Sequence, residues 1–125
     1  MADAASSHTP TITKGRGPDG GNFAIIAWTA MGGTGTGAWI ECPGTPQTVY
    51  VNGTFGSGTA VLQGSNEPVT TTTPDGVGLT HEGTTAISAT SEYLKRVWED
   101  VVLLRAVVTG GTGRAINVYV KVRLN

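Results

Sequence analysis

The sequence AINVYVKVRL, from Ala115 to Leu124, decides the fold class. Apolar and polar side chains alternate along it. A strand turns successive side chains to opposite faces of a sheet, so a period of two predicts a strand with one buried and one solvated face. The side chains assigned to the buried face are Ile116, Val118, Val120, Val122 and Leu124.

A second apolar run lies just upstream, from Val101 to Val108, and alternates less. Such a run is typical of a strand with apolar neighbours on both faces. Thr109–Gly113 separates the two runs and supplies glycines for the positive φ angles of a tight turn. The sequence therefore predicts that the two strands pair as an antiparallel hairpin, with the first of them at the centre of the core.

The rest of the chain repeats this organisation of short apolar runs between Gly, Pro, Asn and Asp. Only Ser91 to Asp100 indicates a helix, because Ser91 suits an N-cap and apolar side chains follow at helical spacing. We expect an all-β protein, an antiparallel β-sandwich or jelly roll with at most one short helix. The other predicted strands are Phe23–Ala30, Ala38–Cys42, Thr48–Asn52, Thr59–Gly64, Val69–Thr73 and Thr85–Ala89.

The first 21 residues differ from the remainder, because they are small and polar and cannot bury enough surface to order themselves. We interpret residues 1–21 as an extended N-terminal arm and residues 22–125 as one β-sandwich domain. Either a neighbouring chain holds the arm, or the arm folds back along its own sandwich. The hypothesis for its gripping residues names Pro10, Ile12, Lys14 and Arg16.

Composition excludes several classes of function. The net charge of -1 provides no basic excess for nucleic acid or an anionic membrane, so we expect neither as a partner. No signal sequence is evident, and no apolar stretch approaches the roughly 20 residues of a membrane span. The single cysteine, Cys42, precludes an internal disulfide and leaves too few thiolates for structural zinc.

No set of residues predicts catalysis. His8 and His81 lack ligands or a nucleophile at the spacing that metal binding or a triad needs, and Cys42 lacks an activating base. The glycine-rich run at 32–37 lacks the Lys-Ser/Thr of a phosphate-binding loop and suits a hairpin connection better. We therefore expect no catalytic residue, no cofactor and no metal.

The three tryptophans leave one binding function open. Trp28, Trp39 and Trp98 could stack on sugars or bases if exposed, although in so small a chain we expect at least two of them in the core. A glycan-binding or host-adhesion module remains the alternative to a structural role.

The segment TVYVNGTFG at 48–56, followed by GTAVLQGSN at 58–66, resembles small structural proteins of tailed-bacteriophage virions. Tyr93–Arg96 and the VTGG turn at 108–111 are similar to further parts of that family. The resemblance covers residues 45 to 125. LQGSN also occurs in discoidin-like carbohydrate-binding domains, but there an Asp-Gly pair and a Trp follow, which this chain lacks.

The resemblance implies a head decoration, or cement, protein with a jelly-roll-like sandwich and no enzymatic activity. Such a protein would be made in the host cytoplasm and would bind the outer capsid surface, where it bridges major capsid proteins and stabilises the shell. Its expected partners are the major capsid protein and copies of itself, as a dimer or trimer. Another head or tail component is a further alternative.

Overall fold

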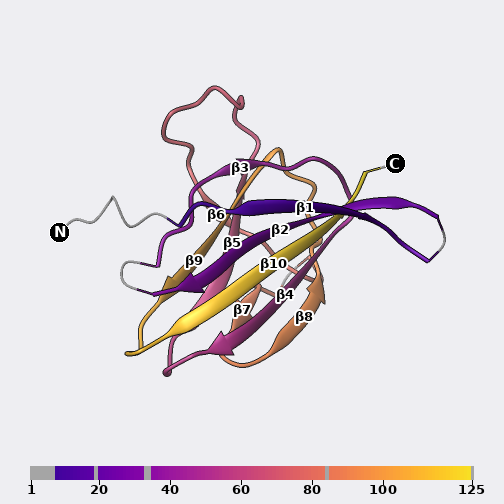
Figure 1. The fold of residues 1–125 in the computed structure, drawn as a ribbon. Coiled ribbons are helices and arrows are strands. Elements are labelled where there is room, and N and C mark those ends of the chain that lie inside the picture. The colour runs from indigo at the N-terminus through magenta and orange to yellow at the C-terminus, as the bar shows by residue number, and fades with distance from the viewer. Residues whose placement is uncertain (1–7, 19, 33–34, 84, 125) are drawn as a thin grey trace.

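The computed structural model describes residues 8–18, 20–32, 35–83 and 85–124, which form two antiparallel sheets packed as a sandwich (Figure 1). Among these residues there is no helix. The first sheet contains, in spatial order, β1 (Thr11–Arg16), β2 (Asn22–Met31), β10 (Ala115–Arg123), β4 (Gln47–Thr54) and β8 (Tyr93–Arg96). The second sheet contains β3 (Ile40–Glu41), β9 (Leu103–Thr109), β5 (Thr59–Ser65) and β6 (Val77–Gly78), with β7 (Ser88–Ala89) also paired to β5.

The strand pairings are nested along the chain. β2 pairs with β10, β3 with β9, β4 with β8, and β5 with β6 and β7. From β2 to β5 and again from β7 to β10, successive strands alternate between the two sheets. One long folded-over hairpin wrapped in this way has the connectivity of a jelly roll. The predicted fold class is confirmed, and β1 adds one further strand beside β2.

The predicted hairpin between the last two long strands is wrong. β9 pairs with β3 and β5, whereas β10 pairs with β2 and β4 in the other sheet. The glycines between them do adopt positive φ, 73° at Gly110 and 69° at Gly111, but their turn carries the chain across the sandwich. The reason is that each strand has one strongly apolar face, and the two faces bury each other best from opposite sheets.

The connection at residues 32–37 is likewise not a hairpin, because β2 and β3 lie in different sheets. Trp28, near the end of β2, is fully buried, and its indole Nε1 donates a hydrogen bond to the Ala38 carbonyl at 3.1 Å. The Gly37 backbone lies against the same indole, so close that a Cβ there would sit 2.6 Å from Trp28 Cδ1. This contact fixes where the chain crosses between sheets.

The core lies between the two sheets and follows the alternation read from the sequence. In β10, Ile116, Val118, Val120 and Val122 are buried, while Lys121 and Arg123 are exposed. β9 directs Leu104, Ala106 and Val108 into the core from the other side. The alternation predicted for the last strand is therefore confirmed.

The predicted helix at Ser91–Asp100 is also wrong, because Tyr93–Arg96 forms β8 at the edge of the first sheet. Tyr93 is half-buried and Val97 buried, whereas Leu94, Lys95, Arg96 and Trp98 are exposed, so this edge strand contacts the core at only a few positions. A short isolated helix is costly to nucleate, whereas β8 completes hydrogen bonds along β4.

The predicted strand at Val69–Thr73 is absent, because a turn closes there with the Thr71 amide bonded to the Pro68 carbonyl at 2.9 Å. Two other predicted strands are shorter than expected. Ala38–Cys42 contracts to β3, and Thr85–Ala89 contracts to β7.

The described part of the N-terminal segment lies along its own sandwich. His8 exchanges backbone hydrogen bonds with Thr36 and Ala38, at 3.0 and 2.8 Å. The chain then crosses to the first sheet, where Thr11–Arg16 pairs antiparallel with β2 as strand β1. This arrangement corresponds to the second of the two alternatives stated for the arm.

Candidate interaction surfaces

The β1 edge, Thr11–Arg16, is the outermost strand of the first sheet, and among the described residues it pairs only with β2. Ile12, Lys14 and Arg16 lie opposite Ile26, Ala24 and Asn22 of β2, so the structure brings three of the four hypothesised residues onto one side of one strand. Because Ile26 and Ala24 point into the core, this is the side of the sheet that faces the second sheet. All three hypothesised residues are exposed, whereas Pro10 is half-buried just before the strand. An unpaired edge with exposed side chains can accept a strand from a partner.

Basic residues are concentrated on the strands of the first sheet. Six of the eight Lys and Arg residues lie there, two on each of three strands. Of the nine acidic residues, seven fall within the described part of the chain, and none of these seven is on a strand of this sheet. The small net charge therefore hides a concentration of basic residues on these strands, although Glu92, which directly precedes β8, also lies beside this sheet. The six basic residues are Lys14, Arg16, Lys95, Arg96, Lys121 and Arg123.

The outer face is the side of the first sheet that points away from the second sheet. Its central row crosses four strands through Ala27, Tyr119, Tyr50 and Leu94. The two tyrosine rings stack with centroids 6.0 Å apart. The Tyr50 hydroxyl donates to Glu92 Oε2 at 2.5 Å, and this hydrogen bond raises the pKa of Tyr50.

The next row of the outer face is basic. Lys121 and Arg96 both flank Thr48, on opposite sides in the strand register. Arg123 follows two residues after Lys121 and points to the same side. Protein interfaces favour tyrosine and arginine side chains, and on this face the tyrosines lie at the centre with the arginines at the strand ends.

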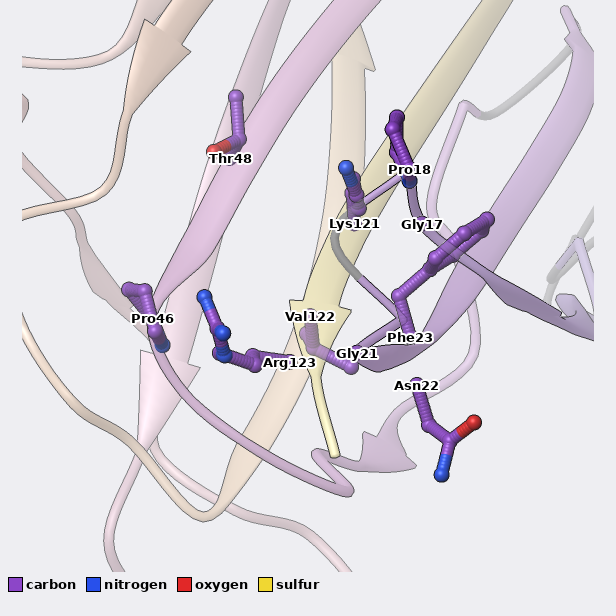
Figure 2. Close-up of a pocket in the computed structure, with 10 residues that line it drawn as sticks. All are labelled: Gly17, Pro18, Gly21, Asn22, Phe23, Pro46, Thr48, Lys121, Val122 and Arg123. Carbon is purple, nitrogen blue, oxygen red and sulfur yellow. The ribbon is translucent and has the colours of Figure 1, made fainter. Parts of the chain in front are cut away.

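A pocket of about 420 Å³ opens at the end of the outer face that adjoins β1 (Figure 2). Figure 2 shows Lys121 and Arg123 rising from β10, with Phe23 of β2 on one side and Pro46 and Thr48 on the other. Lys121 Nζ lies 4.9 Å from the centre of the Phe23 ring, a cation–π contact. Gly17 and Pro18, which directly follow β1, also line it, so the end pocket and the β1 edge form one continuous surface.

Sequence reasoning did not find the end pocket. Phe23, Pro46 and Lys121 are far apart in the chain, and only the β2–β10–β4 pairing brings them together. The alternation in β10 did place Lys121 and Arg123 on its solvated face. The alternation therefore identified Lys121 and Arg123 as exposed cations, but it gave no information about the residues of β2 and β4 beside them.

A second hollow, of about 500 Å³, lies against the second sheet. Trp98 lines it and is 67% exposed, and Val77 of β6 is 66% exposed. Of the three tryptophans, Trp28 is buried, and Trp39 is half-buried beneath the Arg105 guanidinium. Only Trp28 is therefore fully in the core, one fewer than the minimum of two expected from the sequence. The Trp98 hollow is lined by Gly64, Ser65, Asn66, Val77, Gly78, Leu79, Trp98, Glu99, Asp100 and Val101.

Glu99 is held in a fixed position within this hollow. Its Oε1 accepts a hydrogen bond from the Thr80 amide at 2.9 Å, and its Oε2 accepts one from the Thr80 hydroxyl at 2.6 Å. Burial alone would raise the pKa of Glu99, but these hydrogen bonds outweigh burial and bring that pKa below its ordinary value. The hollow therefore carries an ionised carboxylate at neutral pH.

The residues considered for nucleophilic or base chemistry are not assembled into a site. The Cys42 thiol donates to the Gly44 carbonyl at 3.1 Å and accepts from Gln47 Nε2 at 2.9 Å, and burial raises its pKa. A raised pKa disfavours the reactive thiolate. The nearest partner of His81 is Glu82, with 3.8 Å between Nδ1 and Oε1.

Within the described residues, no three His, Cys, Asp or Glu side chains converge as metal ligands would. The same part of the chain contains no helix of the length and apolar character that a bilayer crossing requires. Comparison of the sequence with protein-family models and with curated proteins finds no match. The class that fold and surfaces define is thus a small jelly-roll sandwich with a basic first sheet.

Proposed function

We propose that the protein is a structural virion protein that decorates a phage capsid and stabilises it by bridging major capsid proteins on the outer surface. The observation that carries the proposal is the β1 edge, an exposed edge strand continuous with the end pocket and rich in basic side chains. The family resemblance of residues 45–125 gives the type of partner, and the surfaces supply the means of attachment.

Backbone pairing provides the first means of attachment. The unpaired side of the β1 edge offers amide and carbonyl groups to an extended segment of a capsid protein, and backbone hydrogen bonds of this kind give affinity without demanding a particular sequence. Ile12, 45% exposed, adds an apolar contact beside them.

Complementary charge provides the second means of attachment. The outward basic residues Lys121, Arg123 and Arg96 favour a docking surface that carries carboxylates, and complementary charge raises the rate of association and fixes orientation. Lys14 and Arg16 add positive charge on the other face of the β1 edge. A stable contact buries about 800 Å² per partner, more than the end pocket alone offers, so we assign the docking surface to the β1 edge, the end pocket and the outer face together. On a symmetric shell, many modest contacts of this kind stabilise the particle collectively.

The test is binding of the purified protein to expanded phage heads assembled without it, followed by heating of decorated and bare heads. We expect saturable binding and survival of decorated heads at temperatures that disrupt bare ones. Absence of binding would refute the decoration role and favour a tail or adhesion component.

The contribution of the β1 edge is tested with Lys14→Glu combined with Arg16→Glu. Deletion of residues 2–20 is a poor test, because it removes β1 and uncovers β2. Lys95→Glu is the matched control, since Lys95 is an exposed lysine on the opposite edge strand, β8. Reduced occupancy with the double variant and normal occupancy with the control would support the assignment.

A further inference from the structure

The Trp98 hollow differs from the proposed docking surface in position and charge. It is built by the end of β5, by β6 and by the chain between β8 and β9, whereas the docking surface belongs to the first sheet. Glu99 and Asp100 line it, and Glu67 and Asp75 lie within two residues of its lining. It is therefore an acidic site with an exposed aromatic side chain.

The Trp98 side chain is held as a platform. Its backbone amide donates to the Thr80 carbonyl at 2.8 Å. One part of its indole packs on Gly83, where an added Cβ would lie 3.3 Å from both Cε2 and Nε1. Trp98 as a residue nevertheless stays 67% exposed, which leaves its side chain accessible to a ligand.

Polar acceptors line the same hollow as Trp98. Both carboxylate oxygens of Glu99 accept from Thr80, and a carboxylate has about four acceptor sites in all, so Glu99 can accept from a further donor. The Asp100 carboxylate is exposed, and Asn66 Oδ1 is fixed by the Val102 amide at 2.8 Å. A volume of about 500 Å³ is in the range of small-ligand sites.

We propose that the Trp98 hollow binds a neutral saccharide. A pyranose with equatorial hydroxyl groups has a flat face of C–H groups that stacks on an indole, and its hydroxyls donate to carboxylate and amide oxygens. Anionic sugars are repelled by Glu99 and Asp100. The ligand class is therefore an uncharged hexose or N-acetylhexosamine unit, recognised as a terminal residue or within a chain.

This inference does not rest on the decoration role, because its evidence comes from the opposite sheet and its test uses the isolated protein. The probes are chitohexaose, cellohexaose and maltohexaose, with sialyllactose and polygalacturonate as anionic comparators. Binding is measured by calorimetry and by tryptophan emission. Trp98 is the most exposed of the three tryptophans, so stacking should shift its emission to shorter wavelength.

We expect at least one neutral oligosaccharide to bind and neither anionic comparator to do so. Trp98→Ala should weaken binding by about tenfold or more, because loss of one aromatic stack is worth about 1–3 kcal/mol. The Trp98→Tyr variant should bind more tightly than Trp98→Ala but less tightly than wild type. Asp100→Ala should weaken saccharide binding severalfold. Leu94→Ala is the matched control, a 63% exposed apolar residue on the first sheet, and should bind normally.

Three results would each overturn the proposal: no binding of any neutral probe, binding that Trp98→Ala leaves unchanged, or equal binding of the anionic comparators. Thermal melting of each variant establishes that it is folded. Trp98 and Leu94 are both largely exposed, so neither substitution should lower the melting temperature appreciably.

Discussion

Reversing the charge of Lys121 and Arg123, the two outward basic residues of β10, tests the docking surface most directly. Lys121→Glu with Arg123→Glu replaces two positive charges in the end pocket by two negative ones. Each exposed ion pair is worth about 0.5 kcal/mol, so losing two attractions and gaining two repulsions costs about 2 kcal/mol of binding free energy. That corresponds to roughly thirtyfold weaker binding to heads.

The fold should tolerate this change. Both side chains are exposed, and the cation–π contact between Lys121 and Phe23 contributes about 0.5–1 kcal/mol at such a site. The melting temperature should therefore fall by only a few degrees. A larger fall would mean that reduced occupancy reflects unfolding, and Lys121→Gln with Arg123→Gln would then replace the reversal.

The assay measures occupancy of bare heads by sedimentation at low and at high salt. Because salt screens exposed charges over about 8 Å at physiological ionic strength, the difference between wild type and variant should shrink as salt rises. Lys95→Glu, which changes charge by the same amount per site on β8, should bind as wild type does. Equal losses in both variants, or a difference that salt leaves unchanged, would refute the argument from the basic surface.

Three further predictions concern the fold and its titrating groups. Trp28→Phe should lower the free energy of unfolding by about 2 kcal/mol in denaturant titration, because it leaves a void and an unpaired Ala38 carbonyl; an unchanged midpoint would contradict this. Cys42 should alkylate slowly in the folded protein, with a rate that keeps rising with pH beyond the ordinary thiol pKa of 9.0, whereas the unfolded chain should react faster at neutral pH. Glu99→Gln should be less stable than wild type at neutral pH. Because the pKa of Glu99 is lowered in the folded protein, the ionised carboxylate stabilises the fold fully above pH 4.5, and this stabilisation is lost as the pH falls below 4.5 and through the folded pKa. The difference in unfolding free energy between wild type and Glu99→Gln should therefore vanish in acid. A difference that persists in acid would contradict the role of the Thr80 hydrogen bonds.

Much of the fold could be predicted, because the strands that enclose the core have strong local patterns. Predicted bounds for β2, β4, β5 and β10 differ from the observed ones by one or two residues. Alternation in β10 also gave the correct buried face. A half-buried strand must repeat with a period of two wherever its partners lie, so this information is local.

The pairing of strands could not be predicted in the same way. A glycine-rich turn after an apolar run suggests a hairpin, and the turn at Gly110 and Gly111 has the φ angles that one would need. In a jelly roll, however, each strand pairs with one distant in the chain. That choice depends on which two apolar faces enclose the core best, a property of the whole chain and not of the turn.

The helix predicted over Tyr93–Trp98 failed for a related reason. Apolar residues at 93, 94, 97 and 98 fit a helical stripe, but they fit an edge strand equally when Leu94 and Trp98 are allowed to be exposed. The sequence-based reading assumed that apolar side chains are buried. The exposed ones are those that identify a surface for a ligand or partner, so a rule that expects burial will miss them.

The distribution of surfaces follows from the jelly roll itself. Arg96, Lys121 and Arg123 lie on the outer face of the first sheet, whereas Trp98 and its neighbouring carboxylates lie in the chain between β8 and β9, against strands β5 and β6 of the second sheet. A protein that docks through the outer face of the first sheet leaves the Trp98 hollow accessible. Under the two proposals the protein would dock on a capsid through one layer and bind a saccharide at the other, and the end pocket and the Trp98 hollow share no lining residue.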